Sequence, residues 1–518
     1  MKKSLLSMSL PTIPLPAIPA AVTSFFCGAL MVLAFAPFNA WFLILLLPAY
    51  LSWAWLKDSP REAFKRGWWF GVGFFAFGLY WVYYSLHVFG HAPLLLAIGL
   101  TVLLVFYLAI FIAAVGWVQQ RWFSTSSALV RLTLVTPSLW ILFEWLRGTL
   151  LTGLSWLSLG YGLIDSPLAG MATVVGVYGL SFVGLCATGL VVVAITEKNR
   201  QRYISIAGLA ALIFIAFMVG RVHWSEAVGE KISVALVQGN TDQKTKWHLE
   251  QRRSILQSYL DASENYWSQD LIIWPETAMP AYAYQLEDSL FEQLQEKAMR
   301  TNTDLLTGVL SYDFESQQVF NSMRLFAANS AAGQAVYHKR HLVPFGEYMP
   351  FRTLLLFLKQ FIQIPMSDMS PGERQQPLLV VGGYPVAVSI CFEDVFGEEL
   401  IDFLPQANFL VNASNDAWFG DTLAPHQHLE IARMRALETG RYMLRATSTG
   451  ITAIIDDKGR IVSRAPQFEQ AVLTGQIPPL AGATPYVRWG NGAILGLALL
   501  LLIIVLIRGS LGFFRRPF

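Results

Sequence analysis

Three side chains suited to acyl transfer follow short apolar runs in the second half of the 518-residue sequence. Glu276 follows IIWP, Lys339 follows VYH and Cys391 follows VAVSI. A carboxylate can take the proton of a neighbouring thiol, and an ammonium can stabilise the thiolate and an oxyanion. A cysteine at the junction of a strand and a helix also gains from the helix dipole and from free backbone N–H groups. Taken singly, such residues are more often a core cysteine or surface charges.

The elements expected to position these residues alternate between strand and helix patterns from residue 231 to 485. Strands are predicted over 232–240, 270–280, 303–313, the start of 333–350, the start of 384–400 and 408–420, helices over 247–265, 289–302, the end of 384–400 and 426–441, and a hairpin over 446–462. This alternation predicts α/β layering, with helices covering sheets. Glu276, Lys339 and Cys391 would then all lie at strand ends.

Composition places the rest of the chain in a membrane. The sequence is 54% hydrophobic and 14% charged, whereas soluble domains carry about 25% charged residues. The net charge of +2 argues against a nucleic-acid partner. The other two cysteines, Cys27 and Cys186, lie in apolar runs, so the three form neither a disulfide framework nor a zinc site. We also expect His338, His341, His426 and His428 to make ordinary hydrogen bonds and to bind no metal.

Eight apolar segments predict a multi-pass helical bundle, because about 20 residues are needed to cross a bilayer. The predicted spans are 17–37, 40–56, 67–88, 92–118, 129–147, 169–195, 203–221 and 489–507. Residues 1–222 would form a seven-helix transmembrane domain, residues 231–485 a catalytic domain, and residues 486–518 an eighth helix with a short tail. The alternative for the first run is a cleaved signal peptide with Lys2 and Lys3 as its basic region.

Basic residues gather in alternate loops between these segments. They are Lys2, Lys3, Lys57, Arg61, Lys65, Arg66, Arg121, Arg131, Lys198, Arg200, Arg202, Arg508, Arg515 and Arg516. Because loops rich in lysine and arginine stay in the cytoplasm, both termini are expected to be cytoplasmic. The domain at 231–485 would then lie on the periplasmic side of a bacterial inner membrane.

Three further features are predicted at or near the membrane. Glu144 and Arg147 have an i, i+3 spacing that allows a pair on one helix face, either functional or purely structural. The aromatic, glycine-rich segment 152–167 is interpreted as a re-entrant or interfacial element. The apolar segment 350–366 is interpreted as a mobile, lipid-facing flap, with a buried helix as the alternative.

The motifs around the three residues are more specific than the residues themselves. WPETA, YHKRHLVPFGEYMP and ICFED occur in the order Glu, Lys, Cys, which resembles the nitrilase superfamily. The resemblance implies an α-β-β-α sandwich in which Glu276 is the general base, Lys339 the electrostatic stabiliser and Cys391 the acyl-forming nucleophile. Glu347, in PFGE, matches an additional glutamate beside the lysine, and Glu393 follows the nucleophile in a supporting position.

The apolar segments narrow the resemblance to one membrane family. LVQGN, the Lys246–Trp247 pair, SNDAWFG and EWLRG, together with the order of spans, resemble bacterial apolipoprotein N-acyltransferases. Phe392 stands where that family commonly has tyrosine, so a role for the hydroxyl is in doubt. Trp247, Asn415 and Trp418 are candidate substrate-binding residues.

The family resemblance implies a two-step, ping-pong reaction. Cys391 would take an acyl chain from a phospholipid as a thioester and pass it to the α-amino group of a diacylglyceryl-modified apolipoprotein. Such chemistry needs no cofactor and no metal, and a monomer in contact with membrane lipid is expected. The alternatives are a membrane-tethered amidase or nitrilase acting on a small amide, and a transporter with a ligand-binding extracytoplasmic domain. The Glu-Lys-Cys series argues against the transporter.

Overall fold

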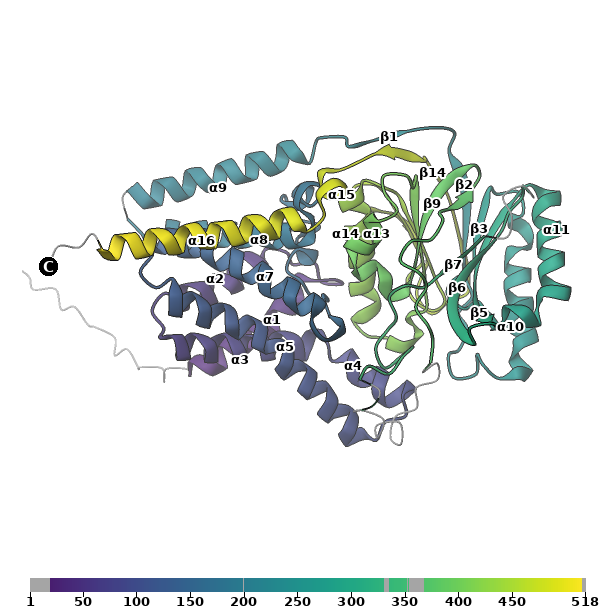
Figure 1. Ribbon diagram of the computed structural model, residues 1–518, viewed down its shortest axis with the longest axis horizontal. Coiled ribbons are helices and arrows are strands. Elements are labelled where there is room, and N and C mark those ends of the chain that lie inside the picture. The colour runs from purple at the N-terminus through teal and green to yellow at the C-terminus, as the bar shows by residue number, and fades with distance from the viewer. Residues whose placement is uncertain (1–18, 199, 330–334, 352, 354–367, 515–518) are drawn as a thin grey trace, which may run out of the picture.

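A computed structural model describes residues 19–198, 200–329, 335–351, 353 and 368–514 (Figure 1). A helical bundle forms one end of the molecule, and a domain built on two large β-sheets forms the other. Strands β1 (Ser225–Ala227) and β15 (Leu480–Gly482) form a further, two-stranded sheet. The predicted flap at 350–366 lies almost entirely outside the described residues, as do Lys2, Lys3, Arg515 and Arg516.

Helices cover each of the predicted spans. They are α1 (Ala20–Met31), α2 (Leu43–Trp55), α3 (Pro60–Gly78) with α4 (Trp81–Tyr84), α5 (Leu94–Trp122), α6 (Ala128–Val130) with α7 (Thr136–Thr149), α8 (Ala172–Thr196), α9 (Arg200–Val219) and α16 (Gly492–Phe514). Within the described ranges, four helical segments are long and apolar enough to cross a membrane, and a bent segment formed by α3, α4 and the π-helix up to Phe89 could be a fifth. The three shorter apolar helices leave the count of eight crossings a prediction.

The outer helices show what surrounds the bundle. Helix α9 runs beside the bundle and α16 along it (Figure 1), and both expose large apolar side chains. Phe214 on α9 is 63% exposed and Ile503 on α16 is 52% exposed. Contiguous apolar surface of this kind is unfavourable in water and is satisfied by lipid. The chain is therefore a membrane protein.

Two stacked sheets form the core of the other domain. The first has the strand order β14 (Ala471–Ile477), β2 (Ile232–Gln238), β3 (Leu271–Ile273), β5 (Asp304–Asp313), β6 (Gln318–Phe326) and β7 (Ala335–His338), with β4 (Met279–Tyr282) beside β5. The second has the order β13 (Ile461–Arg464), β12 (Ala453–Ile455), β11 (Met443–Thr447), β10 (Phe409–Ser414), β9 (Tyr384–Ile390) and β8 (Leu379–Val381). The central strands of both sheets are parallel.

Helices cover the outer faces of these sheets, as the sequence predicts for an α-β-β-α sandwich. Helices α10 (Leu249–Ser263) and α11 (Glu292–Thr301) lie on the seven-stranded sheet, and α13 (Gly397–Ile401) and α14 (Ala424–Thr439) on the six-stranded one (Figure 1). Apolar side chains from both sheets, among them Leu236 and Leu410, form one buried cluster between them. The sandwich is therefore confirmed, although β6 was not among the predicted strands.

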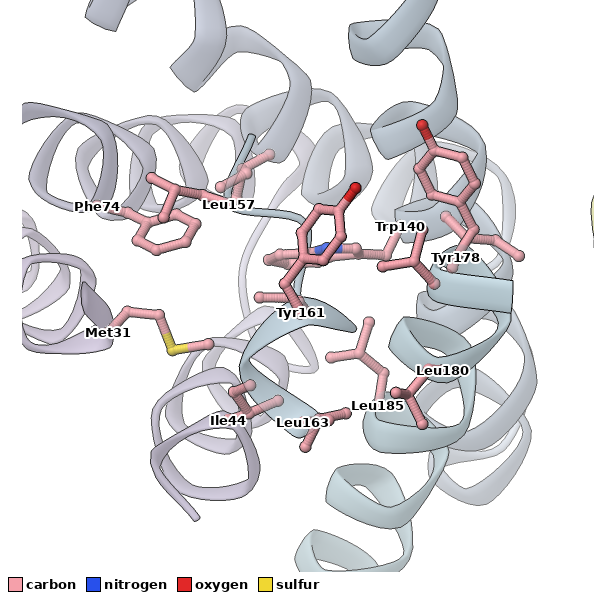
Figure 2. Close-up of a cluster of buried hydrophobic side chains, with 14 of the residues drawn as sticks. Met31, Ile44, Phe74, Trp140, Leu157, Tyr161, Leu163, Tyr178, Leu180 and Leu185 are labelled. Carbon is pink, nitrogen blue, oxygen red and sulfur yellow. The ribbon is translucent and has the colours of Figure 1, made fainter. Parts of the chain in front are cut away.

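Helix α14 also contacts the helical bundle. Met434 and Leu437 of α14 belong to the same buried apolar cluster as the bundle residues around Tyr161 and Leu163. Figure 2 shows the bundle side of this cluster, where Tyr161 and Leu163 lie among side chains from several helices. Residues 155–164 are buried throughout, so this part of the aromatic segment forms a plug between the bundle and the catalytic domain.

Polar contacts reinforce the apolar junction between α14 and the bundle. The indole N–H groups of Trp156 and Trp81 donate to Gln427 Oε1 at 2.8 and 3.2 Å. Glu430 accepts a hydrogen bond from the backbone N–H of Ala36 at 3.1 Å. Because these groups are buried, each satisfied pair fixes the helix at a defined place on the bundle.

Candidate active site

Glu276 lies in the turn that follows β3, and its side chain is buried. The amide of Asn321, on β6 of the same sheet, donates to Glu276 Oε1 at 2.7 Å and to Glu347 Oε1 at 2.9 Å. One amide nitrogen therefore holds two carboxylates side by side. Sequence reasoning missed Asn321, although the alternating pattern of QVFNSMRLF could have identified the strand that carries it.

Lys339 follows β7, and its backbone N–H donates to the carbonyl of Asn321 at 2.8 Å. Its ammonium lies 2.9 Å from Glu347 and 3.6 Å from Glu276 Oε1, with only 1% of the side chain exposed. Burial opposes the charge on this lysine, but the carboxylates of Glu347 and Glu276 outweigh burial and raise the pKa of Lys339. Lys339 is therefore a permanent cation between two carboxylates.

Cys391 begins a short 3₁₀ helix, Cys391–Val395, directly after β9. Its φ of +52° is unusual for a residue with a side chain and marks a sharp turn of the kind that gathers at functional sites. Burial raises the pKa of the Cys391 thiol, and the charge of Glu276 raises it further, while Lys339 lowers it. The group rests as a thiol, so a base must remove its proton before it can attack.

The two sheets thus bring together all three predicted residues. Glu276 and Lys339 come from the seven-stranded sheet and Cys391 from the six-stranded one. The charges of Glu276 and Lys339 both act on the Cys391 thiol, and Lys339 forms an ion pair with Glu276. The arrangement offers a thiol, a carboxylate able to accept its proton, and a cation able to stabilise negative charge.

Glu393 connects the segment around Lys339 to the turn that carries Cys391. Its carboxylate accepts hydrogen bonds from the backbone N–H groups of Ile390 (2.6 Å), Arg340 (2.6 Å) and His341 (3.2 Å) and from the hydroxyl of Tyr337 (3.0 Å). Three of these donors flank Lys339, and the fourth precedes Cys391. The carboxylate therefore fixes the distance between the lysine and the cysteine.

A fully buried charged network lies behind the nucleophile turn. His428 bridges Asp394 (2.9 Å) and Asp416 (2.8 Å), and Arg445 bridges the same two aspartates at 3.2 and 2.8 Å. Asn412 accepts from Arg445 at 2.6 Å and donates to the carbonyl of Cys391 at 3.2 Å.

Burial and Arg445 lower the pKa of His428, but the two aspartates outweigh them and raise it to about 9. The sequence predicts only ordinary hydrogen bonds for His428, whereas in the structure it belongs to this network of ion pairs.

Comparison with known proteins identifies the family of the chain. Residues 27–190 match the model of the apolipoprotein N-acyltransferase N-terminal domain, and residues 233–486 match the carbon-nitrogen hydrolase model. Apolipoprotein N-acyltransferases of Methylococcus capsulatus and Coxiella burnetii are 43% and 41% identical, covering 91% and 93% of this chain and 92% and 99% of theirs. The chain belongs to the apolipoprotein N-acyltransferase family.

Among solved structures, Saccharomyces cerevisiae Nit3, described as a member of branch 10 of the nitrilase superfamily, is 17% identical. The match covers 49% of this chain and 93% of that one, with a TM-score of 0.36.

The remaining predicted residues of this apolipoprotein N-acyltransferase family member lie around the site. The ring of Phe392 stacks on Trp156 of the plug, with centroids 6.4 Å apart, and lies 5.2 Å from Phe396. Trp247 packs in a small apolar cluster with Leu310, Leu342 and Met369. Asn415 donates to Gln243 Oε1 at 2.8 Å, and Trp418 lies 5.5 Å from the ring of Phe89. Substrate binding by Trp247, Asn415 and Trp418 stays a prediction.

The predicted Glu144–Arg147 pair needs correction. Glu144 accepts from the Trp140 indole at 3.0 Å and from the backbone N–H of Leu159 at 2.9 Å. Arg147 donates to the carbonyls of Leu154 and Trp156 and to the hydroxyl of Ser158. In the described part of the chain the two side chains make no close ion pair, although their charges act on each other. Both make hydrogen bonds to the 152–167 segment, because its irregular backbone leaves polar groups unpaired. These hydrogen bonds anchor the plug, which packs against Phe392.

Proposed function

We propose that this chain is an N-acyltransferase that moves an acyl chain from a phospholipid, through a thioester on Cys391, to the α-amino group of the diacylglyceryl-cysteine of apolipoproteins. The observation that carries the proposal is the convergence of Glu276, Lys339 and Cys391 in one buried site, with Cys391 held as a thiol beside a carboxylate. The names of the family relatives support the class of acceptor, and a site joined to membrane helices would suit two lipid-bearing substrates.

The first half-reaction transfers the acyl group to the enzyme. Glu276 accepts the thiol proton as Cys391 Sγ attacks the ester carbonyl of the phospholipid, giving a tetrahedral oxyanion near the Lys339 ammonium. The C–O bond to the glycerol oxygen then breaks. That oxygen takes the proton from Glu276 and leaves as the hydroxyl of a lysophospholipid, while the acyl group stays on sulfur as a thioester.

The second half-reaction transfers the acyl group to the amine. The neutral α-amino group of the acceptor attacks the thioester carbonyl, and Glu276 accepts a proton from the nitrogen. The C–S bond breaks, the thiolate of Cys391 leaves near Lys339 and recovers the proton from Glu276, and an amide is the product. Glu276 and Cys391 return to their initial states, so the cycle is ping-pong and consumes no cofactor.

We further propose a membrane arrangement for this chemistry. Residues 1–222 and 486–518 would hold eight crossings of the inner membrane and residues 231–485 the periplasmic catalytic domain, with both termini in the cytoplasm. Support comes from the alternate distribution of basic loops and from the plug and α14, which join the site to the bundle. Reporter fusions at a residue near 300 test this arrangement, and a cytoplasmic result would overturn it.

Purified protein in phospholipid vesicles tests the reaction directly. Wild-type protein is expected to gain the mass of an acyl chain on the Cys391 peptide, to lose it with hydroxylamine, and to N-acylate a diacylglyceryl peptide. Cys391→Ala should neither gain the acyl chain nor N-acylate the peptide, whereas Cys186→Ala, which changes a cysteine in α8, should do both. N-acylation by Cys391→Ala contradicts the proposal, and hydrolysis of small amides without acyl transfer favours a membrane-tethered amidase instead.

A further inference from the structure

A second buried lysine, Lys246, lies beside the turn that carries Glu276. Lys246 belongs to the loop between β2 and α10, and only 2% of it is exposed. Its ammonium donates to Thr277 Oγ1 at 2.7 Å and lies 3.5 Å from the backbone carbonyl of Glu276. A buried ammonium is costly unless its surroundings use it, and the mechanism above assigns Lys246 no part.

The loop holds Lys246 in a fixed position. The backbone N–H of Lys246 donates to the carbonyl of Asp242 at 3.0 Å. The neighbouring Gln243 accepts a hydrogen bond from Asn415, at the end of β10. The loop is thus tied to the six-stranded sheet while the Lys246 side chain reaches the turn of the seven-stranded one.

The turn that Lys246 contacts is strained and tightly enclosed. Thr277 has a φ of +47°, which is a rare conformation for a β-branched residue and persists only where neighbours enforce it. Gly308 on β5 lies against the turn, and a Cβ there would come within 2.3 Å of the Thr277 backbone nitrogen. The close packing of Gly308 and the hydrogen bond from Lys246 to Thr277 Oγ1 therefore both restrain the turn that carries Glu276.

The charges facing the site also require a second cation. Asn321 holds the carboxylates of Glu276 and Glu347 together, and Lys339 is the ammonium that both share. Burial lowers the pKa of Lys246 to about 8, although Glu276 raises it in part, so Lys246 is mostly charged near neutral pH. Lys246 and Lys339 are thus two cations near the carboxylates of Glu276, Glu347 and Glu393, and the charge of Asp416 also acts on the Cys391 thiol.

We propose that Lys246 is a positioning residue for the general base: its hydrogen bonds to Thr277 Oγ1 and to the Glu276 carbonyl fix the turn that carries Glu276, and its charge adds a second cation near that base. The inference rests on the proposed function and goes beyond it, because Lys246 touches neither substrate nor reacting atoms. Its loss should change when Glu276 can accept a proton, and should leave the Cys391 turn intact.

The pH dependence of Cys391 alkylation tests this role without any substrate. Full-length protein in detergent is treated with iodoacetamide across a pH series, and modification of the Cys391 peptide is followed by mass spectrometry. In Lys246→Met the acidic limb should move to higher pH, because a positive charge near the base is lost, and alkylation on that limb should slow about tenfold for each unit of the shift. Lys246→Arg should restore much of the limb.

Lys244→Met is the matched control, since Lys244 is an exposed cation on the same loop; its profile should overlay the wild type. A folded Lys246→Met protein with an unshifted profile overturns the proposal. If Lys246→Met does not fold, Thr277→Val, which removes the acceptor and keeps the shape, should shift the limb in the same direction by a smaller amount, and no shift overturns the proposal equally. Failure of the proposed function is distinct: wild-type protein would then form no thioester from phospholipid vesicles, whatever the alkylation profiles show.

Discussion

The turn that carries Cys391 (the nucleophile turn) and the turn that carries Glu276 (the base turn) meet at one site but are held in different ways. Behind Cys391, two aspartates, His428 and Arg445 form a closed set of ion pairs with 0–1% of each side chain exposed. Around Glu276, the direct contacts are an amide from Asn321 and a longer, 3.6 Å approach of Lys339. Ion pairs therefore hold the turn that carries Cys391, whereas a neutral amide and a lysine shared with a second carboxylate contact the side chain of Glu276.

The difference follows from what each turn must do. The backbone at Cys391 has to keep a left-handed conformation throughout the reaction, and a buried ion-pair network defines geometry well even where it adds little net stability. Glu276 has to gain and lose a proton twice in the proposed cycle, so a tight, permanent ion pair would oppose its chemistry. A rigid network of ion pairs therefore supports the nucleophile, whereas the looser contacts around the base allow it to gain and lose a proton.

The largest effect that would sharpen this contrast is expected from Glu276→Gln. Glutamine keeps the shape and the contact with Asn321 but cannot accept a proton, so thioester formation should slow by about 10²- to 10⁴-fold with little change in thermal unfolding. Rapid-quench mass spectrometry of the Cys391 acyl-enzyme measures the rate. Retention of more than about a tenth of the wild-type rate would show that another group is the base.

Arg445→Met should have the opposite profile, because it leaves Asp394 and Asp416 with one cation between them. Removing one partner from a buried network costs about 3–5 kcal/mol of unfolding free energy, measured by thermal unfolding in detergent. Arg433→Met is the control: its partner, Asp165, is 38% exposed, so the expected cost is at most about 1 kcal/mol. Equal costs for the two variants would remove the contrast between the turns.

A smaller, pH-dependent effect should come from His428. Its pKa is raised to about 9 from 6.5, so the stabilisation from its charge is complete below the unfolded value and is lost as pH rises through the folded value. Wild-type unfolding free energy should fall by about 3 kcal/mol over this window. His428→Gln should remove that slope. A slope that survives in His428→Gln belongs to other groups.

Phe392→Tyr should have the smallest effect. The ring is half-buried and packs on Trp156 and Phe396, and a hydroxyl added at its rim leaves those contacts in place. Acyl transfer is expected to stay within about threefold and unfolding within about 1 kcal/mol, as for most substitutions away from buried polar groups. A large gain in rate in the N-acylation assay would show that the family's usual tyrosine hydroxyl takes part. The turn that carries the nucleophile would then also contain a group that contributes to the chemistry.

The sequence predicted the reacting groups better than what supports them. Glu276, Lys339 and Cys391 each follow a recognisable apolar strand, so local pattern locates them. Asn321 lies on a strand that was not predicted, although it binds two carboxylates. The partners of His428 come from distant parts of the chain, and no local pattern shows that a fold will bring them together.

The membrane region shows the same limit. Helical periodicity and apolar length located the segments, but α1 and α2, at 12 and 13 residues, are shorter than the roughly 20 residues of a full crossing. The i, i+3 spacing of Glu144 and Arg147 correctly placed both on α7. It could not show that the irregular 152–167 segment would compete for their hydrogen bonds.

Helix α14 has a practical consequence for anyone who isolates the catalytic domain. One side of the helix is part of the sandwich, and the other presents Met434, Leu437 and Glu430 to the bundle. Expression of residues 231–485 alone would expose this buried surface to solvent. It would also remove the bundle groups that make hydrogen bonds to its carboxylate and its amide. We expect such a fragment to aggregate, so detergent or nanodiscs are needed even for experiments that concern only the thiol.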